Sequence, residues 1–220
     1  MAAPLAPCAA RLDNPRCPSG IAIAGMVMPD YGARGMPANR SHQIEGRPIR
    51  VYDGLIAQQD IYRLTAAMES GAFKRDEVAR PEISGFRHWA LNIPLETAPR
   101  LPVYQPTLDA VREFEGGEHY KIYRCYCNHA GYGDMLFTHT DAAPGQPGLT
   151  ALWFVAPEWN VEWGGETLFF NSQMDAEVAV SPRPGRLVVF DGAITHVGRP
   201  PNRICYAPRY TLAFKLKPEN

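Results

Sequence analysis

Six short apolar runs after residue 118 constrain the fold more than any other feature of this sequence. They read YKIYRCYC, LTALWFVA, ETLFF, AEVAVS, RLVVF and YTLAFKL, and turns containing Gly, Pro and Asn separate them. Short runs of this kind at regular spacing are typical of an all-β sandwich or barrel. The 21 prolines and 19 glycines also favour many turns over a helical bundle. We therefore predict a mainly β (α+β) fold whose core, over about residues 118–217, is a jelly roll with helices packed on its outside.

Two helices are predicted before this core. The first covers residues 58–70 and ends at Gly71, and its apolar face consists of Ile61, Leu64, Thr65 and Met68. The second covers residues 107–115 and stops at Gly116-Gly117, and its inward side chains are Leu108, Val111 and Phe114. Residues 1–45 are rich in Pro, Ala, Gly and Arg without a steady period, so we expect a loosely structured arm or lid. Residues 46–220 then form a single domain.

Composition and charge exclude several classes of function. The 220 residues carry a formal net charge of −1, which gives no reason to expect nucleic acid or an anionic membrane as a partner. The sequence has no run of 18 apolar residues and shows no secretory signal. Its five cysteines are odd in number and form no Cys-x-x-Cys pair, so we expect free thiols and a cytoplasmic location. Cys125 and Cys127 are interpreted as small buried residues on one strand face rather than as half of a zinc site.

The stretch FTHTDA, residues 137–142, contains two candidate metal ligands. In an extended chain His139 and Asp141 project to the same side, so one ion can accept both. His196 follows the apolar run RLVVF, and a jelly roll returns that later strand beside the first. Two imidazoles and one carboxylate make the facial triad of non-haem Fe(II) oxygenases. A structural zinc site would need four ligands, usually including thiolates, and no cysteine lies within a few residues of these three.

Arg209 is a candidate anion-binding residue. In the run RYTLAFKL it shares one strand face with Thr211 and Ala213, whereas the other face is apolar. An arginine that faces into a barrel is costly unless an anion meets it, and a guanidinium binds a carboxylate through two parallel hydrogen bonds. The pattern predicts that a dicarboxylate chelating the metal at one end is held by Arg209, next to Thr211, at the other.

From about Tyr120 to Leu216 the sequence resembles the Fe(II)/2-oxoglutarate-dependent oxygenases, in particular their prolyl-4-hydroxylase-like branch. The residues that carry the resemblance are His139-Thr-Asp141, Gly164-Gly165-Glu-Thr-Leu168, Phe190-Asp191-Gly192 before His196, and Arg209-Tyr-Thr-Leu. The resemblance implies a double-stranded β-helix, Fe(II) at the triad, 2-oxoglutarate against Arg209, and a hydrogen bond from Tyr126 to that cosubstrate. Phe154 stands where the hypoxia-sensor prolyl hydroxylases of this branch carry a second tyrosine.

The resemblance also implies the reaction. Related halogenases have Ala or Gly in place of Asp141, so the aspartate predicts hydroxylation of an unactivated C–H bond, with O₂ consumed and succinate and CO₂ released. We expect the substrate to be an amino acid, a peptide or a small natural product. Alternatives are a peptidyl-prolyl hydroxylase acting on a protein, a catalytically silent jelly-roll module that keeps a metal, and a cupin-type dioxygenase, which would have no use for Arg209.

Candidate substrate contacts remain open at this point. Trp153, Trp159 and Trp163 either shape a substrate cleft or are packing residues, and His129 is either a polar contact or a solvated loop residue. The segment RPEISGFRHWALNIP, residues 80–94, is a candidate cover over the site.

Overall fold

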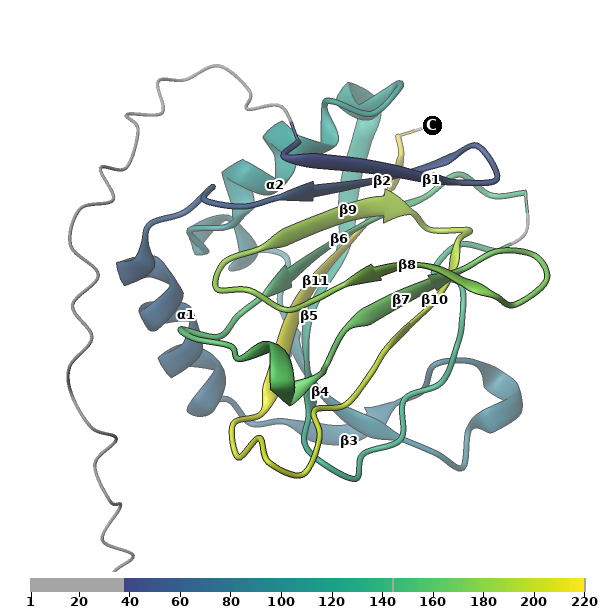
Figure 1. Ribbon diagram of the computed structural model, residues 1–220. Coiled ribbons are helices and arrows are strands. Elements are labelled where there is room, and N and C mark those ends of the chain that lie inside the picture. The colour runs from purple at the N-terminus through teal and green to yellow at the C-terminus, as the bar shows by residue number, and fades with distance from the viewer. Residues whose placement is uncertain (1–37, 144, 220) are drawn as a thin grey trace, which may run out of the picture. The chain divides into compact units, whose positions relative to one another are not determined.

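The computed structural model describes residues 38–143 and 145–219. Their strands form two sheets that face each other, with α1 and α2 beside the larger one (Figure 1). The larger sheet has the order β1-β2-β9-β6-β11-β5-β4-β3, and the smaller has the order β10-β7-β8. The strands are β1 (Arg40–Ile44), β2 (Arg47–Tyr52), β3 (Lys74–Glu77), β4 (His88–Ile93), β5 (Tyr120–Ala130), β6 (Leu149–Phe154), β7 (Thr167–Phe170), β8 (Ala176–Val180), β9 (Leu187–Asp191), β10 (Thr195–Gly198) and β11 (Arg209–Pro218). This architecture confirms the predicted jelly roll.

Strand β11 organises the molecule because it lies between β5 and β6 in the larger sheet. Its side chains alternate between the two faces of the sheet. Leu212, Phe214 and Leu216 are fully buried in the main hydrophobic cluster, together with residues of both helices. The opposite face, which carries Arg209, Thr211, Ala213 and Lys215, points between the sheets, so these three polar residues lie in the interior of the jelly roll.

The helices cover the outer face of the larger sheet. Helix α1 (Gln58–Glu69) agrees with the prediction, and all four residues of its expected apolar face are buried. Helix α2 (Tyr104–Val111) begins three residues before the predicted start and ends before the predicted end. Phe114, which was expected on its inward face, is buried beyond its last turn. Gly117 packs against the end of α2, where a Cβ would meet the carbonyl oxygen of Val111. Short 3₁₀ helices occur at η1 (Pro81–Ile83), η2 (Ala98–Arg100), η3 (Gly117–His119) and η4 (Val161–Trp163).

The interior between the two sheets is apolar at one end and polar at the other. At the apolar end Phe169 of β7 packs edge-on against Phe190 of β9, with ring centroids 4.9 Å apart, and Val180 of β8 joins the same cluster. At the other end the side chains between the sheets include histidine, aspartate, arginine and lysine. A polar interior is costly, so its groups require partners or a ligand.

Strands β1–β4 were not predicted from the sequence. Residues 40–44 were assigned to the loosely structured arm, but they form β1 and pair with β2, and residues 1–37 of that arm lie outside the described residues. The proposed cover, residues 80–94, is wrong in part, because residues 88–93 form the sheet strand β4 between β3 and β5. These strands escaped prediction because β1 and β3 are short, polar edge strands without alternating hydrophobicity.

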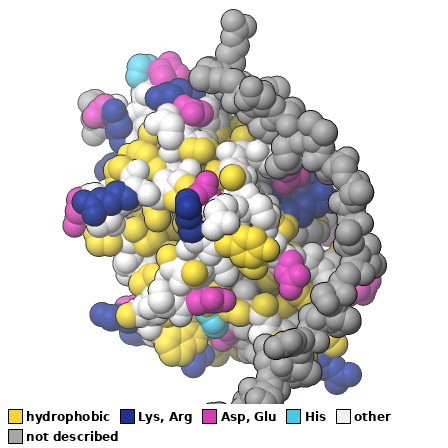
Figure 2. Space-filling view, turned by 90° about the vertical axis from the view of Figure 1, so that its left-hand side faces the viewer, with side chains coloured by type: hydrophobic (Ala, Val, Ile, Leu, Met, Phe, Trp, Pro, Cys, Tyr) yellow, Lys and Arg dark blue, Asp and Glu magenta, His cyan; other side chains and the backbone are white. Residues whose placement is uncertain are grey.

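The described surface is mixed in character. Figure 2 shows the face on the left of Figure 1, where basic and acidic side chains stand among apolar and uncharged ones rather than in one single-sign patch. Among the described residues, no helix has the length and apolar character needed to span a membrane.

Candidate active site

The structure brings His139, Asp141 and His196 together between the two sheets. One ligand atom from each of the three residues lies within 4.8 Å of the others. The Nε2 atoms of His139 and His196 are each 3.4 Å from an Asp141 carboxylate oxygen. His139 belongs to an isolated backbone bridge with His196 rather than to a regular strand, and the two residues exchange N–H···O bonds of 3.0 and 2.9 Å. This bridge fixes the loop that carries His139 and Asp141 against β10.

The imidazole rings are oriented by backbone carbonyls. The Nδ1 atom of His139 lies 3.0 Å from the carbonyl oxygen of Phe137, and that of His196 lies 3.0 Å from the carbonyl oxygen of Ile194. When Nδ1–H donates to these carbonyls, both Nε2 lone pairs are free and point toward Asp141. Histidine ligands of metals are commonly held by this kind of second hydrogen bond.

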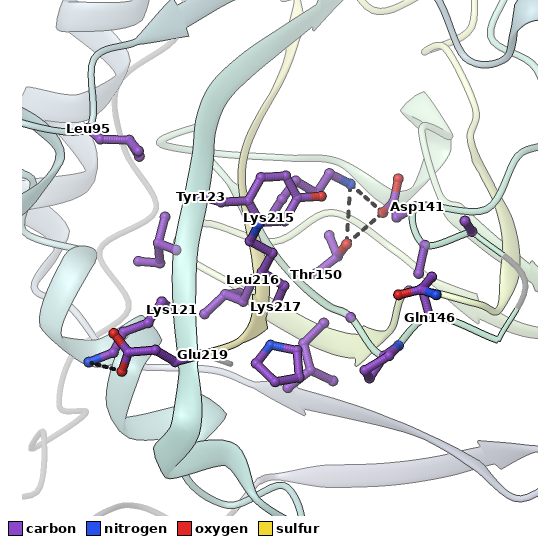
Figure 3. A pocket seen from close by; sticks show the side chains of 18 residues that line it. Leu95, Lys121, Tyr123, Asp141, Gln146, Thr150, Lys215, Leu216, Lys217 and Glu219 are labelled. Atoms are coloured by element: carbon purple, nitrogen blue, oxygen red, sulfur yellow. Dashed lines mark hydrogen bonds and ion pairs between the residues drawn. The ribbon is translucent and has the colours of Figure 1, made fainter.

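Asp141 is held by two residues that the sequence analysis missed, Thr150 of β6 and Lys215 of β11. The hydroxyl of Thr150 donates to Asp141 Oδ2 at 2.6 Å, and the ammonium of Lys215 contacts the same oxygen (Figure 3). Lys215 also donates to the Thr150 hydroxyl at 3.2 Å. Because these contacts concentrate on Oδ2, Oδ1 is the oxygen that remains available on the side of His139.

Burial and charge set the protonation of His196 and Asp141. Burial lowers the pKa of His196 to about 4, so this imidazole is neutral near pH 7, the form that binds a metal. Burial by itself would raise the pKa of the Asp141 carboxyl, but the neighbouring cation of Lys215 outweighs it and holds that pKa well below its usual value. The site therefore presents neutral imidazole and ionised carboxylate, which are the ligand forms that Fe(II) requires.

Arg209 lies in the same inner cavity as the three candidate ligands. Its guanidinium is only 3% exposed, yet its hydrogen-bond partners are all uncharged: Nε donates to the Gly165 carbonyl at 2.6 Å, Nη2 to Thr167 Oγ1 at 2.8 Å and Nη1 to Thr211 Oγ1 at 3.3 Å. Burial lowers the pKa of Arg209 to about 10, which still leaves it charged near neutral pH. A buried cation held by neutral groups is a site for an anion.

Two glycines make room for this guanidinium. A Cβ atom at Gly198 would approach the Arg209 guanidinium atoms to 3.0–3.2 Å, and one at Gly165 would lie 2.9 Å from Trp159 and 3.3 Å from Arg209 Cδ. Gly165 also has φ +83°, a conformation that L side chains rarely adopt. The Gly164-Gly165 turn noted in the sequence thus allows Arg209 to reach the interior.

Tyr126 and Thr211 both line the inner cavity. Tyr126 is 6% exposed, and its burial raises the pKa of the phenol, which therefore stays protonated and can donate a hydrogen bond. Phe154, at the position of the second tyrosine of the hypoxia-sensor enzymes, is fully buried with its ring centroid 5.2 Å from the Arg209 guanidinium carbon. An aromatic face thus replaces a hydroxyl beside the arginine.

Other candidate contacts lie elsewhere. His129 packs between Phe73 and Tyr210, with ring centroids 5.6 and 5.4 Å away, and lines neither of the two described cavities. Trp153 is a core residue that donates to Thr107 Oγ1 at 2.8 Å, whereas Trp159 and Trp163 pack on each other in the loop before β7. Cys125 and Cys127 are buried free thiols on one strand face, as predicted, and burial raises the pKa of both.

A jelly roll that brings two imidazoles and a carboxylate together beside a buried arginine defines the class of non-haem iron oxygenases. Residues 122–215 match the family model of the 2OG-Fe(II) oxygenase superfamily. None of the curated proteins compared matches the sequence. This match, over a segment that holds the triad and Arg209, confirms the resemblance seen in the sequence and indicates a dioxygenase enzyme.

Solved structures with the same fold include prolyl hydroxylases and an enzyme with nickel and 2-oxoglutarate bound. A Pseudomonas putida prolyl-4-hydroxylase aligns with a TM-score of 0.58 at 17% identity, over 78% of this chain and 93% of that one. A Trichoplax adhaerens prolyl hydroxylase, in complex with a hypoxia-inducible-factor peptide fragment, aligns with a TM-score of 0.57 at 16% identity, over 77% and 83%. HygX from Streptomyces hygroscopicus, with nickel and 2-oxoglutarate bound, aligns with a TM-score of 0.58 at 15% identity, over 77% and 82%. At these identities the likeness is one of fold.

The cofactors of the superfamily, Fe(II) and 2-oxoglutarate, fit the residues present. The triad offers two imidazole nitrogens and a carboxylate oxygen at one point, and Arg209 supplies a buried cation, hydrogen-bonded to neutral groups, in the same cavity. A dicarboxylate that reaches from one to the other meets complementary charge at both ends.

Proposed function

We propose that this enzyme hydroxylates an unactivated C–H bond of a small molecule, with one O₂ and one 2-oxoglutarate consumed and one succinate and one CO₂ released for each hydroxyl group introduced. This proposal rests on the placement of His139, Asp141 and His196 close together beside the buried Arg209. In this proposal the first three are the Fe(II) ligands and Arg209 binds the distal carboxylate of 2-oxoglutarate. Bound Fe(II) supplies the activation of O₂, which protein side chains cannot perform.

The chain's own residues position the reactants. The guanidinium of Arg209 fixes one end of 2-oxoglutarate, Thr211 lies beside it, and the protonated phenol of Tyr126 donates a hydrogen bond to it. Thr150 and Lys215 keep Asp141 Oδ2 engaged, which leaves one carboxylate oxygen for the metal. Apolar residues that line the inner cavity, Leu136, Phe137 and Leu152, exclude water from the reacting groups.

A small molecule is favoured over a protein substrate by the cavity that adjoins Asp141. Its volume of about 860 Å³ falls in the range of small-molecule sites. The solved neighbours include both kinds of ligand: HygX has been solved with hygromycin B, and the Trichoplax enzyme with a peptide. Peptidyl-prolyl hydroxylation is therefore the second candidate, and the peptide-bound neighbour is the observation that favours it.

Succinate formation without added substrate tests the proposal against a catalytically silent module. Purified protein is incubated with Fe(II), 2-oxoglutarate and O₂, and succinate is quantified by mass spectrometry. We expect slow succinate release by the wild type and by Arg203→Ala, an exposed arginine outside the site, but none above background by His196→Ala. Equal background release by the wild type and His196→Ala, also in the presence of a library of small molecules, would support the silent module.

A further inference from the structure

A second cavity, of about 860 Å³ and here called the outer cavity, adjoins the Asp141–Lys215 pair (Figure 3). Its walls come from residues 121–123 of β5, from residues 142–143 and 146–149 after the His-x-Asp pair, and from residues 215–219 at the end of the described chain. Among the described residues, only Asp141 and Lys215 line both cavities. The two cavities therefore adjoin at this pair, and a molecule in the outer cavity abuts a residue of the triad.

A β-bulge builds one wall of the outer cavity. Along β11 the partner of Lys215 is Arg124, but the partner of Leu216 is Ile122, so Tyr123 is an extra residue in β5. The bulge reverses the alternation of β5: Cys125 and Cys127 belong to the main hydrophobic cluster, and beyond the bulge Tyr120 and Ile122 pack against that same cluster. Tyr123 and Lys121 consequently face the other way, toward the outer cavity. Bulges near active sites commonly redirect a side chain in this manner.

Among the described residues, the charged groups of the outer cavity leave one cation without an ion-pair partner. Lys121 pairs with Glu219 at the rim, at 3.4 Å. Lys215 is committed to Asp141 and Thr150. Lys217 forms no ion pair with any described carboxylate, and its ammonium lies 5.6 Å from the centroid of the half-exposed Tyr123 ring. An exposed ammonium over an aromatic face is a recognition element for an anion attached to an apolar body.

We propose that the outer cavity binds the substrate and that the substrate is a small carboxylic acid, whose carboxylate pairs with Lys217 and whose apolar body packs on Tyr123. This inference rests on the proposed hydroxylase function. The lining supports the apolar part, since Leu95, Ala142 and Pro147 accompany Tyr123. With its carboxylate at the rim and its body directed inward, the acid presents its far end to Asp141. A neutral or cationic molecule of the same shape gains nothing from Lys217.

A matched pair of probes tests the charge preference. Phenylacetate and phenylacetamide have nearly the same shape, and only the first is an anion. Their dissociation constants are measured by calorimetry on the full chain saturated with Mn(II) and 2-oxoglutarate, and again on the metal-free protein. We expect phenylacetate to bind up to roughly fivefold more tightly than the amide, which is the upper limit for a partly exposed ion pair. Lys217→Gln should remove this difference, whereas Lys74→Gln, an exposed lysine of β3, should preserve it.

Lys217 is exposed, so its replacement does not disturb the core. Equal affinities of the acid and the amide for the wild type would overturn the inference, and so would an acid preference that Lys217→Gln retains. Displacement of phenylacetate by 2-oxoglutarate would also overturn it, because the acid would then occupy the inner cavity. Failure of the protein to bind Mn(II) and 2-oxoglutarate would instead count against the proposed function, and the comparison on metal-free protein would still decide the charge preference.

Discussion

Replacing Arg209 with alanine removes a buried guanidinium that forms no ion pair with any carboxylate of the described residues. The side chain has five N–H donors, and three of its hydrogen bonds go to Gly165, Thr167 and Thr211, which are all neutral at the contacting atom. The remaining donors are available to a carboxylate. A charge-assisted contact of this kind contributes about 1.5–3 kcal/mol, so Arg209→Ala should weaken 2-oxoglutarate binding roughly 10- to 150-fold.

The assay is calorimetry of 2-oxoglutarate binding to Mn(II)-loaded protein. Arg209→Lys should recover only part of the affinity, because an ammonium lacks the two-pronged geometry of a guanidinium. Arg203→Ala is the matched control, since it removes an exposed arginine and should leave the affinity unchanged. Because Arg209 is buried, thermal unfolding must first show that each variant is folded. An affinity for 2-oxoglutarate equal to that of the wild type in folded Arg209→Ala would refute the reasoning.

The other predictions concern the triad and two buried ion pairs. His196→Ala should bind less than one equivalent of Fe(II) and lose turnover, and full iron content with full activity would contradict its role as a ligand. Asp141→Gly should hydroxylate far less, and it opens a metal coordination position to chloride or bromide. Mass spectrometry of the products checks this. Halogenated product from the wild type would argue against hydroxylation. Lys215→Met should lower the unfolding free energy of the metal-free protein by about 3–5 kcal/mol, because it leaves a buried carboxylate unpaired. Mn(II) should then raise the Tm of this variant more than that of the wild type, and equal shifts would count against the pairing. Asp53 accepts two 2.7 Å hydrogen bonds from the buried Arg186; burial would raise the pKa of Asp53, but Arg186 lowers it overall. The stabilisation is therefore present above the unfolded pKa of about 3.9 and is lost as the pH falls through the lower folded pKa. Asp53→Asn should lower the free energy of unfolding, measured in urea at pH 7, by about 1–2 kcal/mol. The loss is modest because the carboxylate is 35% exposed. A loss of the same size at acid pH would contradict this origin.

Local patterns in the sequence predict the strands and the helix whose apolar residues recur regularly. The runs that became β5, β6, β7, β8, β9 and β11 show clear apolar patterns bounded by turn residues, and α1 shows a steady helical period. The order His139, Asp141, His196 and Arg209 also predicted the chemistry, because few reactions use two imidazoles, a carboxylate and an interior guanidinium together. Such signals are local, or depend only on residue type and order, and a single chain displays them directly.

Contacts between residues far apart in the sequence could be seen only in the tertiary structure. Lys215 is an ordinary polar residue in the run YTLAFKL, and only the pairing of β11 with β6 brings it to Thr150 and Asp141. Strands β1 and β3 carry too little apolar surface to be recognised, and they exist because β2 and β4 offer them unpaired backbone groups. The bulge at Tyr123 likewise depends on the register between β5 and β11. Periodicity reveals which face a side chain occupies, whereas strand order and register, set by packing across the whole sheet, determine what it faces.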